Sequence, residues 1–325
     1  MTMKDISIPS ERLDVFLKEF GQRVSSASET RPCVRCWKMS DLQKEISAIV
    51  REKHAELKSN FPPAIKLIEQ LEAIGWLFPV ATSQSKASPQ ASRFFLVDME
   101  AGNNPIIDPF ELLMASIPNG IVSYFSALSF YGLTTQTPPF YHIGRLVKHA
   151  DNRPLSTEEQ RNAPKTTRPV RDPLGTALFS FKDKVYYSTK RDESSVPGIQ
   201  MRVMSPRSWI RITTKEQTLL DALCQPMRCG GPAVVLEAWD TSARDALNEE
   251  RILTYCNHIN KTDLVRRLGS IYELMGYKAI LPEFQKYLDA LHTQMQTRPY
   301  DYRPIPLLEG YSASNNINSW GIALP

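Results

Sequence analysis

The segment Pro118–Tyr141, PNGIVSYFSALSFYGLTTQTPPFY, is the stretch that decides the fold of this chain. Its turn residues Pro118–Gly120 precede an amphipathic helix predicted from Tyr124 to Tyr131. Gly132 follows directly and is expected to end that helix as a C-cap. The segment contains no catalytic signature, and it is informative because it specifies this helix.

A second segment, Ile212–Gly231, reads ITTKEQTLLDALCQPMRCGG. Thr213 or Thr214 is the expected N-cap of a helix, with Glu216 in its first turn and Pro226 stopping it. We expect Cys229-Gly230-Gly231-Pro232 to end one helix and start the next. The buried face of the predicted helix consists of three leucines, Leu219, Leu220 and Leu223.

A third segment consists of Arg266–Gly269, RRLG, followed by Leu274–Gly276, LMG. Together and in this order, the three segments resemble the AbiEi family, the antitoxin and transcriptional-regulator proteins of bacterial type IV toxin–antitoxin systems. Family members carry a similar "SALxxxGLTeQ" helix, a "TLLDxL" helix that leads to a "GG" pair, and an "RRLG" ending. The resemblance covers Pro118 to Gly276.

The resemblance implies a role in phage defence. It implies that the chain represses its own operon by binding operator repeats in double-stranded DNA. It also implies that the second domain counteracts a nucleotidyltransferase-like toxin without forming a stable complex with it. A homodimer is compatible with binding to inverted repeats.

Composition sets broader bounds. A chain of 325 residues is expected to hold two or three domains, and its 42% hydrophobic and 23% charged residues are ordinary for a globular protein. The net charge of +4 permits an acidic partner such as nucleic acid without demanding one. No apolar run approaches the roughly 20 residues that span a bilayer, and the N-terminus has no apolar core. We therefore expect a cytoplasmic protein that does not interact with membranes.

Five cysteines do not suggest a disulfide framework. Cys33 and Cys36 form a C-x-x-C pair, but a zinc site would need two further ligands at suitable spacing, and the nearest histidine, His54, stands alone. Reduced, partly buried thiols are the better interpretation. We predict neither a metal nor a cofactor.

Residues 1–100 show the element order of a winged helix-turn-helix. The first helix begins at Ser10 and the second at Ser40, and a third follows Pro63 and ends at Gly75. Two strands, Trp76–Val80 and Arg93–Val97, are joined by a polar segment. The predicted fold class is α+β: a winged helix-turn-helix domain over residues 1–100, followed by a mixed α/β domain over residues 101–325.

In such a domain the third helix enters the major groove, and the wing reaches phosphate or the minor groove. The alternative is a winged helix that binds protein, which the acidic residues of this region, such as Glu69 and Glu72, favour. The predicted DNA contacts on the helix-turn-helix are Lys58, Ser59, Asn60, Lys66 and Gln70, and those on the wing are Lys86 and Arg93.

Residues 98–117 read as a linker. Beyond it we predict a strand at Phe140–Gly144, a hairpin turning at Asp183 and a strand at Met201–Val203. Residues 145–191 carry eleven Lys and Arg against five Asp and Glu, so the basic character is concentrated there. Candidate nucleic-acid contacts in this domain are Arg145, Lys148, Arg168, Arg171, Lys182, Lys184, Arg207 and Arg211.

The chain lacks a phosphate loop, a G-x-S-x-G elbow and an H-E-x-x-H motif, so we predict that it is not an enzyme. Asp221 is expected to pair with a nearby base rather than to act in catalysis. The aromatic residues from Tyr124 to Tyr141 are expected to form core rather than to stack on bases. Arg207, Trp209 and Arg211 alternate along a strand whose face either meets phosphate or forms a charged edge.

Arg266 and Arg267 are expected near a helix end, where they would oppose the helix dipole. Two other functions remain open from the sequence. One is a protein- or RNA-binding module without operator binding, and the other is a nuclease.

Overall fold

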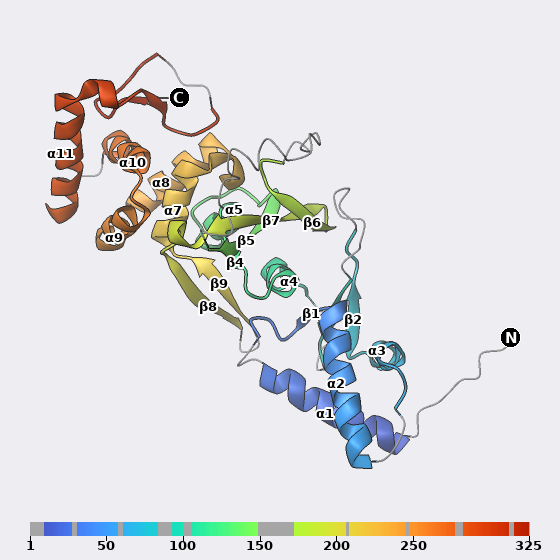
Figure 1. The fold of residues 1–325 in the computed structure, drawn as a ribbon. Helices are drawn as coiled ribbons and strands as arrows, with labels where there is room; N and C mark the ends of the chain where they lie inside the picture. The colour runs from blue at the N-terminus through green and yellow to red at the C-terminus, as the bar shows by residue number, and fades with distance from the viewer. Residues whose placement is uncertain are drawn as a thin grey trace, which may run out of the picture. The chain divides into compact units, whose positions relative to one another are not determined.

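The computed structural model describes residues 10–27, 31–57, 61–83, 93–99, 106–148, 172–205, 208–244, 247–276, 282–311 and 315–324 (Figure 1). Contacts divide the chain into two compact units. Unit 1 comprises Met1–Asn119, Leu178–Asp183 and Met201–Ile210, and unit 2 comprises Gly120–Ala177, Lys184–Gln200 and Arg211–Pro325. The expected boundary after residue 100 does not coincide with this division, because residues 106–119 and two later segments group with the N-terminal elements.

Unit 1 contains four helices and a small sheet among its described residues (Figure 1). In chain order these elements are α1 (Ser10–Ser26), β1 (Cys36–Lys38), α2 (Met39–Leu57), α3 (Ala64–Ala73), β2 (Leu77–Val80), β3 (Phe94–Val97) and α4 (Pro109–Ser116). The strands lie in the order β1-β3-β2, and both pairings are antiparallel. The two predicted strands therefore pair as expected, and the three-residue strand β1 adds an edge that the sequence analysis did not predict.

The helices of unit 1 bury one face each. Phe16 and Phe20 of α1 and Leu42 and Ile46 of α2 are fully buried, as their spacing predicts. In α3 the buried residues are Leu67, Ile68 and Leu71. Ile65 and Ile74 are exposed, because Ile65 lies on the side of the helix opposite Leu67 and Leu71, and Ile74 is the C-cap residue that follows the last turn.

The predicted linker at residues 98–117 is wrong, because it contains α4. Asp108 caps this helix by accepting a hydrogen bond from the Phe110 amide at 2.7 Å, and Pro109 occupies the first turn. Leu112, Leu113 and Met114 are fully buried. A short helix that is apolar on nearly every side shows no periodic stripe, which is why the pattern did not reveal it.

A six-stranded mixed sheet runs in the order β6-β7-β5-β4-β9-β8. Its strands are β4 (Ile121–Val122), β5 (Phe140–Val147), β6 (Thr176–Phe181), β7 (Lys184–Asp192), β8 (Ile199–Ser205) and β9 (Ser208–Thr213). β5 pairs with β7 in parallel and with β4 antiparallel, while β4 pairs with β9 in parallel. The predicted strands and the turn at Asp183 are confirmed, and both residues of that turn, Lys182 and Asp183, have positive φ.

The remaining α-helices of the described chain lie in unit 2, and two of them have the caps that the sequence predicts. They are α5 (Phe125–Phe130), α7 (Lys215–Cys224), α8 (Pro232–Arg244), α9 (Glu249–Ile259), α10 (Thr262–Met275) and α11 (Pro282–Thr297). Thr214 caps α7 by accepting from the Gln217 amide at 3.2 Å, and Gly132 follows α5 with a φ of 63°. The predicted caps of both helices are thereby confirmed.

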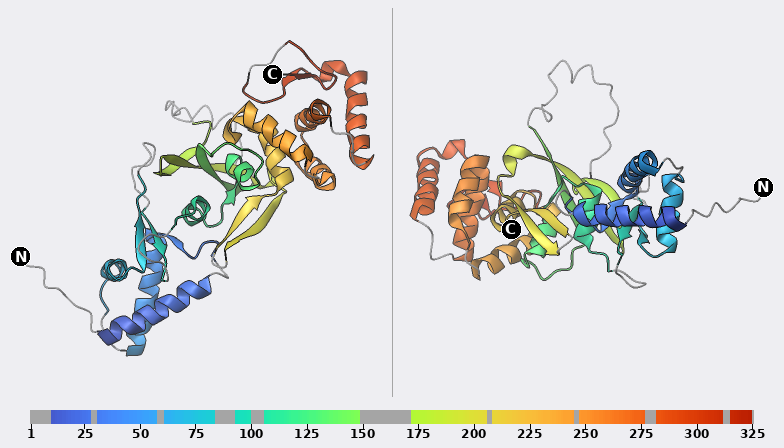
Figure 2. Two further views of the ribbon diagram at one scale, coloured as in Figure 1. Left: turned by 180° about the vertical axis from the view of Figure 1, so that it is seen from behind. Right: turned by 90° about the horizontal axis from the view of Figure 1, so that it is seen from below.

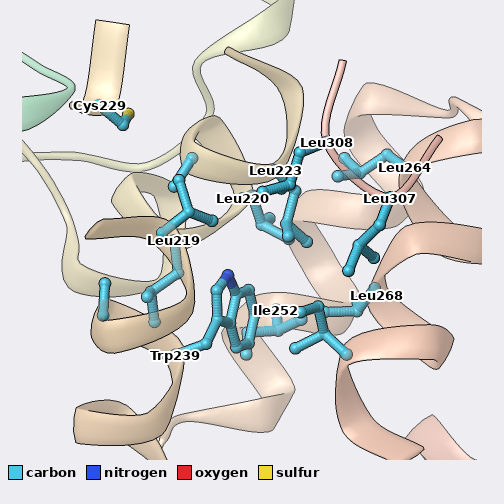
Figure 3. Close-up of a cluster of buried hydrophobic side chains, with 14 of the residues drawn as sticks. Leu219, Leu220, Leu223, Cys229, Trp239, Ile252, Leu264, Leu268, Leu307 and Leu308 are labelled. Carbon is cyan, nitrogen blue, oxygen red and sulfur yellow. The ribbon is translucent and has the colours of Figure 1, made fainter. Parts of the chain in front are cut away.

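The core of unit 2 is built around α7. Leu219, Leu220 and Leu223 pack with Trp239 of α8 (Figure 3). The same cluster contains Leu264 and Leu268 of α10, and Leu307 and Leu308 of the C-terminal segment that follows α11. Helices α8 to α11, coloured orange to red, lie together in both views of Figure 2. The buried leucine face predicted for residues 215–224 is therefore the centre of this core.

Arg266 and Arg267 correct a further prediction. They lie in the first half of α10 and are buried, so they do not oppose the dipole at its C-terminal end. Arg266 Nε donates to the Trp320 carbonyl at 3.0 Å, and its Nη2 donates to the carbonyls of Arg303 and Gly321, each at 2.9 Å. The guanidinium thus holds the C-terminal segment against α10.

Among the described residues, no helix is both long and apolar enough to cross a membrane.

Candidate functional site

The predicted DNA-contacting residues that the structure describes lie on α3 and at the start of β3. Lys66 is exposed on α3, and Arg93 is exposed immediately before β3. Gln70 is half-buried, and its Oε1 is buried without a hydrogen-bond partner among the residues that the structure describes. The remaining predicted contacts, Lys58, Ser59, Asn60 and Lys86, lie outside the described residues.

The exposed surface of α3 is mixed in character. Ile65 is 55% exposed and Ile74 is 45% exposed, and Glu69 is exposed beside Lys66. Burial and the charge of Glu69 raise the pKa of Glu72, while the charge of Arg93 opposes that rise. This surface therefore presents one lysine, acidic groups and apolar side chains rather than a uniformly basic face.

A polar pocket of about 160 Å³ lies within unit 2. Two of the three segments that were recognised in the sequence line it, since Tyr124 comes from the first and Asp221 and Arg228 come from the second. Leu264 of α10, which precedes the third segment, also lines the pocket. β7 contributes Lys190 and Arg191 to the lining, and Lys261, directly before α10, also lines the pocket.

A buried ion pair forms the inner wall of this pocket. Arg191 Nη2 lies 2.7 Å from Asp221 Oδ1, and Arg191 Nη1 donates to Ser123 Oγ at 3.0 Å. Gln217 Nε2 donates to the same Asp221 oxygen at 2.9 Å. Burial lowers the pKa of Arg191, but Asp221, together with Tyr124 and Cys229, opposes this effect, and the pKa is raised. The prediction that Asp221 pairs with a base is confirmed.

Tyr124 connects the pocket to the sheet through an unusual backbone conformation. Its φ of 58° and ψ of −133° are rarely adopted by a residue other than glycine. Such a conformation costs roughly 1–3 kcal/mol and is often found at functional sites. The ring lies 4.9 Å from the Arg191 guanidinium and 5.5 Å from that of Arg228, whose Nη1 donates to the Tyr124 hydroxyl at 3.4 Å.

The prediction that the aromatic residues of the first segment form core is confirmed for Tyr124, Phe125 and Phe140, which are buried. Phe130 and Tyr141 are half-buried. Tyr124 has a second role that the sequence did not reveal, because it also lines the pocket.

The predicted nucleic-acid contacts of the second domain are scattered. Arg145, Lys148 and Lys182 are exposed, and Lys184 is half-buried on β7. Lys148 and Arg211 line one groove of about 560 Å³ together with His258, Asp192 and Glu193. Arg168, Arg171 and Arg207 lie outside the described residues, so the face expected from Arg207, Trp209 and Arg211 is described only in part; Trp209 and Arg211 are half-buried on β9.

The four cations of the polar pocket, Lys190, Arg191, Arg228 and Lys261, were not predicted. Their positions depend on contacts between residues far apart in the chain. The one available signal was Asp221, a carboxylate on the leucine-rich helix that required a basic partner.

The C-x-x-C pair lies in the interior of unit 1. Cys33 is 2% exposed and Cys36 is fully buried, and the Cys36 amide donates to Cys33 Sγ at 3.1 Å. Burial raises the pKa of Cys33 to about 12, so its thiol is protonated at neutral pH. In the described part of the chain, no three His, Cys, Asp or Glu side chains gather as metal ligands.

No family model matches the chain, and no curated protein matches it. Among solved structures, the crystal structure of the RV2827C protein from Mycobacterium tuberculosis is similar to it, with 13% sequence identity and a TM-score of 0.49. The match covers 94% of this chain and 91% of that one. A likeness at this level carries no functional argument.

Proposed function

We propose that the protein is a DNA-binding transcriptional regulator of the AbiEi type, which represses its own operon by binding operator repeats. The observation that carries the proposal is the order of elements in unit 1. Helix α1, strand β1, the successive helices α2 and α3, and the β2–β3 pair follow one another, and β3 lies between β1 and β2. A winged helix-turn-helix domain has this order, and its third helix reads the major groove.

In this proposal α3 is the recognition helix and the β2–β3 connection is the wing. Lys66 is exposed on α3 and can reach a base edge or a phosphate, while Arg93 at the base of the wing contacts phosphate. Binding would depend strongly on salt, because each neutralised phosphate releases counterions.

We assign the antitoxin role to unit 2. The support is the resemblance of its three sequence segments to the AbiEi family, the first two of which contribute residues to one pocket in the fold. The proposed functional partner is a nucleotidyltransferase-like toxin, which is counteracted in the cytoplasm without a stable complex. The role is one of binding rather than catalysis.

The proposal is tested by fluorescence anisotropy of the whole protein with double-stranded DNA from upstream of its own operon. Lys66→Ala should weaken binding by about 1–3 kcal/mol if Lys66 contacts a base. Lys18→Ala is the matched control, because Lys18 is an exposed lysine on α1, which is not one of the two helices of the predicted helix-turn-helix. Equal affinity for operator and scrambled DNA, or an unchanged affinity in Lys66→Ala, would remove α3 from the proposal.

The surface of α3 also favours a second candidate function, a protein-binding module without operator binding. Ile65 and Ile74 are exposed and Glu69 is acidic, and such a surface suits a protein better than a polyanion. The same titration separates the two, since a protein-binding module would show no preference for its own upstream DNA at any salt concentration.

A further inference from the structure

The polar pocket of unit 2 has an excess of positive charge that the proposed DNA binding by unit 1 does not use. Lys190, Arg191, Arg228 and Lys261 border it, against Asp192 and Asp221. Because Asp221 is already neutralised by Arg191 at 2.7 Å, Asp192 is the one further carboxylate among the described lining residues to balance the other three cations. A small space with this charge balance attracts an anion.

Arg191 and Arg228 use only some of their N–H donors in hydrogen bonds to the described residues. Arg191 has five N–H donors, and its hydrogen bonds go to two acceptors, Ser123 and Asp221. Arg228 uses Nε for the Pro173 carbonyl and Nη1 for the Tyr124 hydroxyl. Both guanidinium groups therefore keep further N–H groups that an anion could engage.

The pocket is also held in place by the fold. Arg191 and Asp221 are each 6% exposed, and Arg191 requires the absence of a side chain at Gly144, where a Cβ would lie 2.8 Å from Arg191 Cδ. The strained backbone of Tyr124 places its ring beside the guanidiniums of Arg191 and Arg228. Preorganised donors of this kind bind a ligand without a large ordering cost.

The volume limits the ligand to a compact group. About 160 Å³ corresponds to roughly five water molecules in the liquid. A phosphate group with its first hydration waters or part of its ester substituent has this size. Guanidinium groups match phosphate oxygens in geometry, and lysines supply additional charge. α10 begins directly after Lys261, so its N-terminus adds partial positive charge.

We propose that this pocket binds the phosphate group of a phosphate monoester, with Arg191 and Arg228 as donors and Lys190 and Lys261 as further cations. The inference is independent of DNA binding by unit 1. It does not require a toxin or an operator.

The experiment is isothermal titration calorimetry of the whole protein at constant ionic strength, with inorganic phosphate, ribose 5-phosphate and ribose as separate probes. Phosphate and ribose 5-phosphate should bind saturably, whereas ribose should not. Equal affinities for the two phosphates would mean that the phosphate group alone is recognised, and tighter binding of ribose 5-phosphate would add recognition of the sugar. Affinity should also increase from pH 5.5 to pH 7.5, since a phosphate monoester gains its second charge near pH 6.

Arg228→Gln and Lys261→Gln should each weaken phosphate binding by about tenfold or more. Lys261 is exposed, so its replacement tests the site without disturbing the core. Lys286→Gln is the matched control, because Lys286 is an exposed lysine on α11 of the same unit and does not line the pocket. The proposal is overturned if the wild-type protein shows no saturable binding of either phosphate, if ribose binds equally well, or if Lys286→Gln weakens binding as much as Lys261→Gln.

Discussion

At the level of single residues, Arg191 and Asp221 form a buried ion pair in unit 2, and the stability of the fold depends on both partners being present. Both side chains are buried, and the carboxylate also accepts a hydrogen bond from Gln217. A buried pair gains little over an apolar pair of the same shape, but the loss of one partner leaves an uncompensated charge. The two residues should therefore be strongly coupled.

Asp221→Ala should lower the free energy of unfolding by about 3–5 kcal/mol, because Arg191 would remain charged and buried. Urea denaturation followed by circular dichroism measures this. The double variant Arg191→Met/Asp221→Leu should be destabilised less than Asp221→Ala, since it removes both charges. Additive effects of the two sites in a double-mutant cycle would contradict the predicted coupling.

His142 makes the stability of unit 2 depend on pH. It is fully buried between the rings of Tyr124 and Phe140, and burial, followed by the charges of Arg228 and Arg191, lowers its pKa from 6.5 to about 3. Between these two pH values the unfolded chain binds a proton that the folded protein does not. The folded state therefore loses stability as the pH falls below 6.5.

From pH 7 to pH 5 this residue should cost about 2 kcal/mol of the free energy of unfolding. His142→Phe should remove that part of the pH dependence, since phenylalanine suits the same aromatic surroundings. Tyr187→Phe is the control, because Tyr187 contacts the same imidazole ring and carries no group that titrates in this range. Parallel stability–pH curves for wild type and His142→Phe would show that the histidine is not the cause.

At the level of elements, local signals predicted well where a helix began or ended in a specific side chain. Thr214 and Gly132 marked caps correctly, and Asp183 marked the turn between β6 and β7. Two elements were missed. β1 has three residues, too few to show a period, and α4 was missed although Asp108 and Pro109 mark its start, because a helix that is apolar on nearly every side shows no stripe.

The residues of the polar pocket could not be predicted from local patterns. Arg191 and Asp221 come from a strand and a helix that lie 30 positions apart, and many other bases were equally plausible partners for Asp221 in the sequence. Arg266 shows the same difficulty, because its partners Trp320 and Gly321 belong to the C-terminal segment. Long-range pairing of charged groups is set by packing, which periodicity does not encode.

The cap of α7 gives a prediction at this scale. Thr214 accepts a hydrogen bond from the Gln217 amide, and its hydroxyl donates to Tyr255 at 3.3 Å. Thr214→Ala should lower the free energy of unfolding by about 1 kcal/mol, whereas Thr214→Ser should retain most of it. Tyr255→Phe removes only the second contact and should cost less than Thr214→Ala. Equal losses in Thr214→Ala and Thr214→Ser would show that the methyl group, not the cap, is responsible.

At the scale of the whole molecule, unit 1 is discontinuous in sequence. The Ser83 amide donates to the Ser180 carbonyl at 3.0 Å, and the Trp209 amide donates to the Pro32 carbonyl at 2.8 Å. Phe94 of β3 packs against Phe179, with ring centroids 4.8 Å apart. The N-terminal elements are therefore completed by residues 178–183 and 201–210, which the chain supplies only after it has entered unit 2.

This discontinuity predicts where the effect of a core substitution will appear. Phe179 is 1% exposed, so Phe179→Ala should destabilise its surroundings by about 3–5 kcal/mol. Although residues 178–183 are flanked in sequence on both sides by unit 2, hydrogen exchange should accelerate mainly at the amides of β2 and β3. Phe284→Ala is the matched control, since this fully buried phenylalanine of α11 should accelerate exchange in α10 and α11. If Phe179→Ala accelerated exchange in α10 and α11 and left β3 unchanged, residues 178–183 would not belong to unit 1, and the division of the chain would have to be drawn at Asn119 alone.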